Sequence, residues 1–376
     1  MKTKSLKLLC AIFCIILIVL AVTSCTVDSR YSDYELKQAI DKQNATGTGE
    51  YILVSFPGLG IGASMINSEA IRIGGITVYW YGILITLGIV LAFVYSYFVS
   101  KREGIKVDDL LDMGIWAVIC AVVGARLYYV LTSLDQYKGR FWDVFMIWKG
   151  GIAIYGAIIG GAVAIAVVCL IKKIKILKAY DAIAPAVMIG QIIGRWGNFM
   201  NGEAFGYELR EGDPLYFIRM GVYSSATKQL GEKSIIYVHP TFLYESLWNL
   251  IGFVLINVFF VRKKKFDGQV FFAYIAWYGF GRTFIELLRQ DSLYLTGTIR
   301  ISSLVGALCF FVGTAMFIWF SIRGEKERLA AESYEGVYPL FRTASSTTDA
   351  VNEAEEKEIE ETEKETVEEE DNNEVD

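Results

Sequence analysis

Apolar residues occur in long runs along most of the chain, separated by short polar stretches. Seven of these runs are each near the length of a helix that crosses a bilayer of about 30 Å. They cover residues 77–99, 110–131, 150–171, 180–199, 241–261, 268–289 and 301–322. The pattern therefore predicts an all-α integral membrane protein with a seven-helix transmembrane bundle.

The first 25 residues form a shorter apolar segment behind a basic start. Lys2, Lys4 and Lys7 precede the stretch LLCAIFCIILIVLAV, and small residues follow it. This order is typical of a signal peptide or a short membrane anchor. Its end, VTSC at 22–25, also resembles the lipobox of a bacterial lipoprotein, with Cys25 as the residue that would carry the lipid. A plain uncleaved anchor is the alternative.

Basic residues gather in every second loop between the apolar runs. The clusters follow the first, third, fifth and seventh runs, at 101–106, 172–178, 262–265 and 323–328. Loops rich in lysine and arginine favour the cytoplasmic side, so these four loops are expected to be cytoplasmic. We then expect residues 26–75 to be an extracytoplasmic lead-in. Within the helical domain, residues 76–323, the segment 200–240 forms an outer head region.

The composition agrees with a membrane protein and separates the charge into two parts. The 376 residues are 54% hydrophobic and have a positive mean hydropathy, which exceeds the usual content of a soluble domain. Residues 351–376 hold fourteen acidic residues and two lysines, so the net charge of −5 leaves about +7 for the rest. Residues 324–376 are therefore expected to be a disordered acidic cytoplasmic tail. No basic patch interleaved with aromatic residues points to nucleic acid.

Polar side chains interrupt the fourth apolar run at its end. The stretch GRWGNFMNGEAFG, residues 194–206, contains Arg195, Asn198, Asn201, Glu203 and Gly206. A guanidinium stays charged when buried and presents a planar fork of donors that suits a phosphate. We expect Arg195 to hold an anionic group and Glu203 to neutralise that charge or to accept a proton. The alternative is a loop at the membrane surface, from which Arg195 extends to the headgroups.

A second set of polar residues lies within the sixth run. Tyr278, Arg282 and Glu286 follow one another at intervals of four, so they share one face of a helix. Charged side chains at that depth usually pair and face the bundle interior or a water-filled cavity. A purely structural pair of Arg282 and Glu286 is the alternative to a functional site.

Three further residues have an ordinary explanation beside a functional one. Tyr81 begins the first run, where an aromatic belt is the default explanation. Arg126 carries a charge into the second run, and Tyr155 lies among five glycines that suit tight helix packing. The chain has no Ser/His/Asp set, no Cys/His metal spacing and no glycine-rich nucleotide loop. We therefore expect no metal and no cofactor.

Buried arginines with glutamate and tyrosine partners predict a site for an anionic headgroup near the outer leaflet. An enzyme that acts on a phospholipid would have such a site, and so would a transporter or binding protein for an anionic lipid or solute. A secondary transporter tends to show inverted repeats and two matched broken helices. The chain has one candidate broken helix and no visible repeat, which favours the enzyme.

The stretch GRWGNFMNGEAFG resembles the signature of the bacterial phosphatidylglycerol–prolipoprotein diacylglyceryl transferases. Further blocks follow in the order of that family: WYG at 80–82, GARL at 124–127, GG with YG at 150–156, YDAIAP at 180–185, HPTFLYE at 239–245 and YGFGRTFIELLRQ at 278–290. The resemblance covers roughly residues 50–322. It implies a seven-helix enzyme of the bacterial cell membrane, with an outward-facing head region and the active site toward the outer face.

The implied reaction moves the diacylglyceryl group of phosphatidylglycerol to the lipobox cysteine of a prolipoprotein signal peptide, with a thioether as product and glycerol phosphate as leaving group. The implied substrate-binding residues are Arg195, Asn198, Asn201, Gly206 and Arg126. The implied catalytic residues are Glu203, Arg282, Glu286, Tyr278, Tyr81 and Tyr155. The family often carries a histidine where Tyr155 stands, and tyrosine is a poor base because its pKa is about 10. Either Tyr155 donates a hydrogen bond, or another group serves as base.

Overall fold

The computed structural model describes residues 33–45, 50–231, 234–291, 294–296 and 298–337. The expected signal or anchor segment 1–25 and residues 338–376 of the acidic tail lie outside this part. The chain divides into two units, Met1–Ile318 and Trp319–Asp376. In the second unit the described residues are helical as far as Val337. The bundle described next, with its last helix as far as Ile318, belongs to the first unit, as do the sheet and the site.

Each of the seven predicted apolar runs forms a helix. These are α3 (Trp80–Arg102), α4 (Val107–Thr132), α5 (Ile154–Ile171), α6 (Ile176–Asn201), α8 (Thr241–Ile256), α9 (Gln269–Leu288) and α10 (Ile301–Val337). Among the described helices, six are long and apolar enough to cross a membrane, which fits an integral membrane protein. The exception among the seven is α9, which carries Arg282 and Glu286.

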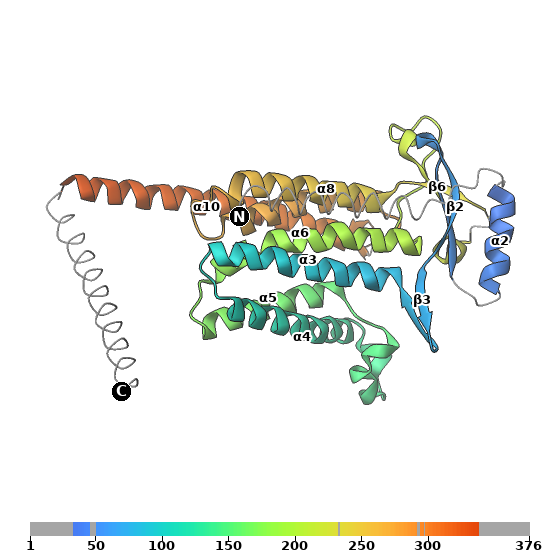
Figure 1. The fold of residues 1–376 in the computed structure, drawn as a ribbon, viewed down its shortest axis with the longest axis horizontal. Coiled ribbons are helices and arrows are strands. Elements are labelled where there is room, and N and C mark those ends of the chain that lie inside the picture. The colour runs from blue at the N-terminus through green and yellow to red at the C-terminus, as the bar shows by residue number, and fades with distance from the viewer. Residues whose placement is uncertain (1–32, 46–49, 232–233, 292–293, 297, 338–376) are drawn as a thin grey trace, which may run out of the picture. The chain divides into compact units, whose positions relative to one another are not determined.

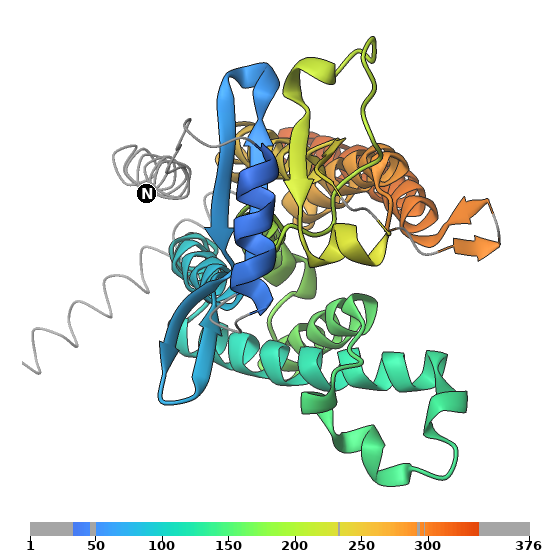
Figure 2. The same ribbon diagram turned by 90° about the vertical axis from the view of Figure 1, so that its right-hand side faces the viewer.

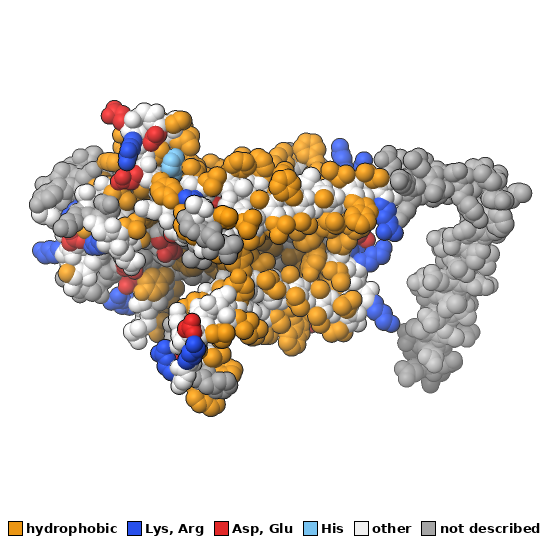
Figure 3. Space-filling view, turned by 180° about the vertical axis from the view of Figure 1, so that it is seen from behind, with side chains coloured by type: hydrophobic (Ala, Val, Ile, Leu, Met, Phe, Trp, Pro, Cys, Tyr) orange, Lys and Arg blue, Asp and Glu red, His pale blue; other side chains and the backbone are white. Residues whose placement is uncertain are grey.

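The outward side chains of the bundle are apolar. Ile115 and Val123 of α4 and Leu170 of α5 are exposed, and such residues form a broad orange band along the helices in Figure 3. Charged side chains gather toward the ends of that band. A helix of a soluble protein would place polar residues on its outer face. The surface is therefore suited to lipid.

Small residues bring α4 and α5 into close contact, and α6 forms the centre of the bundle. A Cβ atom on Gly124 would lie 2.4 Å from the carbonyl oxygen of Gly156, so the two backbones touch directly. Gly156 and Gly160 of α5 thus serve helix packing, whereas Gly150 and Gly151 lie in the preceding loop with positive φ. α6 packs against α3, α8 and α9 (Figure 1) and is the most buried of the six candidate spans.

Three of the basic loops meet at one end of the bundle. Lys172, which follows α5, lies 3.3 Å from Asp109 of α4. Lys264, which follows α8, lies 2.7 Å from Glu103 after α3 and 3.1 Å from the buried Asp181 of α6. These ion pairs join loops that the charge pattern predicts on one side of the membrane.

A small β-sheet covers the opposite end (Figure 1). It contains β1 (Tyr51–Phe56), β2 (Ile61–Asn67), β5 (Met220–Tyr223) and β6 (Ile236–Val238), antiparallel in the order β2-β1-β5-β6. Helix α2 (Asp33–Ala45) lies across it (Figure 2) and buries Ile40 against Leu53 and Tyr223. The predicted lead-in and the predicted head region therefore build one sheet together.

The all-α expectation needs correction at this end. Besides the four-stranded sheet, this end contains two separate hairpins and a short helix. The hairpins are formed by β3 (Glu69–Ile73) with β4 (Ile76–Tyr79) and by β7 (Tyr294–Thr296) with β8 (Ile299–Arg300), and the helix is α7 (Ser225–Gln229). Each strand has only two to seven residues, and β1 pairs with β5, far along the chain. Runs this short give no periodic signal of their own.

Candidate active site

The end of α6 brings four of the predicted residues together. Arg195 Nη1 donates a hydrogen bond to Asn198 Oδ1 at 3.3 Å. The helix ends at Asn201, and Gly202 follows in the left-handed conformation with a φ of 58°, which glycine adopts without strain. This turn folds Glu203 back, so that its Oε1 accepts hydrogen bonds from the amides of Asn198 and Asn201, both at 3.2 Å.

Glu245 of α8 joins this group to α9. Its Oε1 lies 2.6 Å from Arg195 Nη2, and its Oε2 lies 3.1 Å from Arg282 Nη1. Arg282 Nη2 in turn lies 2.7 Å from Glu286 Oε2. Both carboxylates are almost completely buried, with 3% and 2% of their surface exposed. Arginines from two helices therefore share one buried carboxylate, and we call these four residues the shared-carboxylate network.

Glu245 is absent from the predicted site residues, although the sequence holds a signal for it. It is the only charged residue in the apolar run 241–261, and it lies in the HPTFLYE block. That is the signal that singled out Arg282 and Glu286. Arg289 is a second omission: its Nη1 lies 3.9 Å from Glu245 Oε2 and its Nη2 lies 2.7 Å from Asp291.

Two of the predicted tyrosines flank the network. Tyr278 lies one turn before Arg282 on α9 and within electrostatic range of Glu245 and Arg195. Tyr81, at the start of α3, packs directly on Gly197 of α6, where a Cβ atom would lie 2.6 Å from the tyrosine ring. The smallest side chain is therefore needed at position 197 to bring Tyr81 beside the end of α6.

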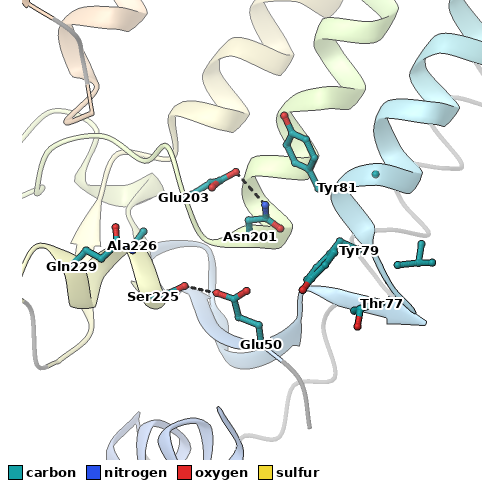
Figure 4. A pocket seen from close by; sticks show the side chains of 11 residues that line it. Glu50, Thr77, Tyr79, Tyr81, Asn201, Glu203, Ser225, Ala226 and Gln229 are labelled. Carbon is teal, nitrogen blue, oxygen red and sulfur yellow. Dashed lines mark hydrogen bonds between the residues drawn. The ribbon is translucent and has the colours of Figure 1, made fainter. Parts of the chain in front are cut away.

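A pocket of about 720 Å³ opens beside the network. Glu203 and Asn201 line it from the end of α6, and Tyr81 lines it from the start of α3. Strand β4, helix α7 and Glu50 complete the wall, and Figure 4 shows these side chains arranged around the open space. Glu203 thus belongs to both the pocket and the polar group around Arg195.

Gly206 supports the turn behind Glu203. It forms a β-bridge with Arg289, and its N–H donates to the carbonyl oxygen of His239 at 2.9 Å. A Cβ atom there would lie 2.6 Å from Cβ of His239 and 2.7 Å from the carbonyl oxygen of Leu288. Gly206 therefore allows the chain after Glu203 to lie against the end of α9. Burial lowers the pKa of His239, and the negative charge of Asp213 offsets part of that lowering.

Arg126 lies outside the shared-carboxylate network. Its guanidinium donates hydrogen bonds to the backbone carbonyl oxygens of Asp143, Val144, Gly150 and Gly151. These residues belong to the loop between α4 and α5, which contains 3₁₀ turns at Leu134–Tyr137, Phe141–Phe145 and Ile147–Lys149. All three guanidinium nitrogens are engaged, so Arg126 holds this loop on the bundle.

Tyr155 connects two helices near the network. At the start of α5, its hydroxyl donates a hydrogen bond to Ser302 Oγ of α10 at 2.9 Å. It also lies within electrostatic range of Tyr278 and Arg282. This hydroxyl makes a hydrogen bond, and the part that Tyr155 plays in the reaction stays a prediction.

The site combines fixed positive charge with donors that remain available. Among the described residues, Arg195 and Arg282 each make contacts through two of their three nitrogens. Buried ion pairs cost desolvation and add little stability, so their position inside an apolar bundle indicates function. No group of three or more His, Cys, Asp or Glu among the described residues is arranged to hold a metal ion.

Comparison with known proteins identifies similar chains. A family model described as prolipoprotein diacylglyceryl transferase matches residues 68–319. A phosphatidylglycerol–prolipoprotein diacylglyceryl transferase from Lysinibacillus sphaericus is 41% identical over 261 residues, which cover 69% of this chain and 93% of the relative. The proteins of the same name from Listeria innocua and Acaryochloris marina are 38% and 41% identical, covering 70% and 67% of this chain and 94% and 89% of the relatives.

Proposed function

Because this chain belongs to the prolipoprotein diacylglyceryl transferase family, we propose that it transfers the diacylglyceryl group of phosphatidylglycerol to the lipobox cysteine of a prolipoprotein. The chain is accordingly a transferase of bacterial lipoprotein maturation. The alternative of a transporter is not favoured, because the relatives above are named as transferases. The observation that carries the proposal is the buried carboxylate of Glu245 shared by Arg195 and Arg282.

The two arginines bind the phosphate of phosphatidylglycerol. A phosphate oxygen competes with Glu245 for their N–H groups, because both partners are anionic acceptors of similar geometry. Arg195 approaches from α6 and Arg282 from α9, so a phosphate between them is held from two sides. Asn198 lies beside Arg195 and orients it.

The reaction breaks one bond and forms another at a glyceryl carbon. The cysteine Sγ attacks that carbon as the C–O bond to the phosphate breaks, and glycerol phosphate leaves with the electron pair. The negative charge that develops on the phosphate is stabilised by the guanidinium groups of Arg195 and Arg282. The thiol must lose its proton because the thiolate is the reactive form.

A carboxylate accepts that proton. Glu203 lines the open pocket and accepts only amide hydrogen bonds among the described contacts. Glu286 is 2% exposed and paired with Arg282. Glu203 is therefore the better placed of the two candidate bases, and Glu286 fixes the guanidinium of Arg282.

The membrane arrangement that fits this function has seven crossings, with α9 as the seventh because it lies inside the bundle beside α6 and α8. The loops that hold Lys172 and Lys264 face the cytoplasm by the positive-inside rule. The sheet and residues 200–240 then form the outer head region, and the site faces outward. Residues 1–25 serve as a signal peptide or anchor; the sequence alone supports this part.

The test is a transfer assay with a lipobox peptide and phosphatidylglycerol in lipid nanodiscs, with a Cys→Ser peptide as control. Mass spectrometry should detect a diacylglyceryl thioether on the first peptide only.

Transfer rates of Glu203→Gln and Glu286→Gln, measured across pH, identify the base. The variant that lacks the base should lose the rise of the rate with pH on the acidic side of the pH–rate profile. Equal, unimpaired activity in both variants would refute a carboxylate base.

A further inference from the structure

Strand β4 has an edge without a strand partner. It pairs with β3 alone among the described strands, and Ile76 faces Ile73 across a two-residue turn. Hydrogen-bonded and non-hydrogen-bonded pairs alternate along an antiparallel ladder, and the pair that closes a two-residue turn is hydrogen-bonded. Thr77 and Tyr79 therefore direct their backbone N–H and C=O groups away from β3.

This edge faces the pocket beside the network. Thr77, Val78 and Tyr79 all line that pocket. Successive side chains of a strand point to opposite faces, so a pocket under one face would be lined by alternate residues only. Three consecutive lining residues place the pocket along the edge itself, and Figure 4 shows Thr77 and Tyr79 on the side opposite Glu203 and Asn201.

We propose that this edge binds the substrate polypeptide as an added β-strand, in the segment next to its reactive cysteine. The proposal rests on the transferase function proposed above. An extended peptide adds to an exposed sheet edge through main-chain hydrogen bonds, while the surrounding pocket selects its side chains. The volume of about 720 Å³ accommodates a short extended segment of a few residues.

The lining of the pocket favours a polypeptide over a lipid phosphate. None of the described residues that line it is basic, and Glu50 and Glu203 are both acidic. An anionic headgroup would be repelled there, whereas Arg195 and Arg282 attract it nearby. The two substrates therefore have separate subsites, one cationic and one with neutral and acidic hydrogen-bonding groups.

The pocket also leads to the reacting groups. Tyr81 and Glu203 line it, and Glu203 is joined through Asn198 to Arg195. A peptide strand along β4 that extends toward Glu203 brings its cysteine beside a carboxylate that can accept the thiol proton. This placement of the peptide beside the network brings its cysteine toward the lipid whose phosphate is held between α6 and α9.

A proline at position 77 tests the edge directly. Thr77→Pro removes an outward N–H and places a ring on the open edge, while the bonds of β4 to β3 are kept. Arg72→Pro is the matched control, because Arg72 pairs with Thr77 on the other strand and does not line the pocket. In phosphatidylglycerol nanodiscs, we expect Thr77→Pro to raise the KM for a lipobox peptide at least tenfold. Its kcat and its KM for phosphatidylglycerol should stay within twofold.

Equal peptide KM values for Thr77→Pro and Arg72→Pro would overturn the subsite while leaving the transferase function intact.

Photo-crosslinking of the wild-type protein gives a second readout. It depends neither on the folding of a variant nor on the diacylglyceryl transfer reaction. A lipobox peptide with Cys→Ser and a photoreactive residue next to that position should attach to residues 77–79 or to Glu50. Attachment without any transfer of the cysteine peptide would support the subsite and refute the proposed function. Attachment elsewhere, or attachment of a phosphatidylglycerol probe at 77–79, would overturn the subsite.

Discussion

Two groups of arginine within the bundle differ in the partners that they hold. Arg195 and Arg282 share the carboxylate of Glu245, each through one oxygen. Arg126 gives all of its nitrogens to backbone carbonyl oxygens of a single loop. Both arrangements stabilise a guanidinium cation inside an apolar bundle. Only at Arg195 and Arg282 is the partner a carboxylate that an incoming anion can replace.

The difference separates binding from support. A phosphate can take the place of a carboxylate at Arg195, because both are anions that accept from a guanidinium fork. A phosphate at Arg126 would have to displace carbonyl oxygens, and the loop between α4 and α5 would lose its attachment. The substrate contact expected of Arg126 therefore stays a prediction, and the structure favours a supporting role for it.

The largest expected effect comes from removal of Arg195. Arg195→Ala should lower the transfer rate by about 10³, because loss of one preorganised donor to a developing charge costs about 10² to 10³. The helical content measured by circular dichroism should not change. Arg195→Lys should recover part of the rate, since it keeps the charge and loses the fork. A rate for Arg195→Ala within tenfold of wild type would show that Arg195 does not bind the phosphate.

Glu245→Gln should have the next largest effect, and on two quantities. It leaves two largely but not fully buried guanidinium groups without their shared anion, so the free energy of unfolding should fall by about 3 kcal/mol. The transfer rate should also fall, by about 10², because both arginines lose their orientation. Denaturation in detergent measures the first quantity. Glu211→Gln, at an exposed position, is the control and should be silent; equal stability of the two variants would contradict the shared carboxylate.

Arg126→Gln should act on the loop and only weakly on the reaction. The segment 133–153 should become sensitive to limited proteolysis, since its carbonyl oxygens lose their common donor. The rate should fall less than tenfold and the KM for phosphatidylglycerol should not change. A specific rise in that KM with the loop still protected would make Arg126 a substrate-binding residue after all.

Tyr155→Phe should have a smaller effect. It removes one hydrogen bond to Ser302, worth about 1 kcal/mol of stability, and it should change the transfer rate less than threefold. Ser302→Ala should have a similar effect, and the double variant should be no worse than either single one. A rate loss above tenfold in Tyr155→Phe alone would give Tyr155 a catalytic part.

The smallest expected effect lies in the head region, far from the arginines. Burial alone would raise the pKa of Asp41, but hydrogen bonds from Lys228 and Tyr223 hold it below its ordinary value. The stability that these Asp41 interactions add to the packing of α2 on the sheet is therefore fully present above about pH 4 and is lost as the pH falls through the lowered pKa of Asp41. The apolar contact of Ile40 with Leu53 and Tyr223 remains. The protection factors of the α2 amides, which remove the intrinsic pH dependence of hydrogen exchange, should fall at low pH in the wild type. In Asp41→Asn they should be reduced already at pH 7 and vary little with pH, and identical profiles for the two proteins would contradict this contact.

The helices could be predicted because the bilayer fixes their length. Each apolar run forms a helix, and most ends shift by a few residues, as in the predicted segment 180–199 and the observed Ile176–Asn201. Helix α10 is the exception, because it continues to Val337 beyond the predicted end at 322. The sheet could not be predicted in the same way. Strand β1 pairs with β5, about 170 residues away, and no local pattern in either strand encodes that partner.

Most residues of the candidate site could be predicted from the sequence, but their ion-pair and hydrogen-bond partners could not. A charge within an apolar run marks Arg195, Arg282 and Glu286, and the same rule applied to the run 241–261 would have included Glu245. The partners of Arg126 could not be foreseen, because backbone carbonyl oxygens exist at every position and leave no trace in the sequence. The polar edge of β4 depends likewise on backbone pairing rather than on residue type.

If Arg195 holds a lipid phosphate in place of Glu245, phosphatidylglycerol should stabilise the folded protein through this residue. Thermal unfolding is measured in nanodiscs of phosphatidylcholine with and without phosphatidylglycerol, for the wild type, Arg195→Gln and Arg126→Gln. A ligand that binds the native state raises the melting temperature. We expect phosphatidylglycerol to raise it for the wild type and for Arg126→Gln, but not for Arg195→Gln. An unchanged rise of the melting temperature in Arg195→Gln would show that Arg195 does not hold the lipid phosphate.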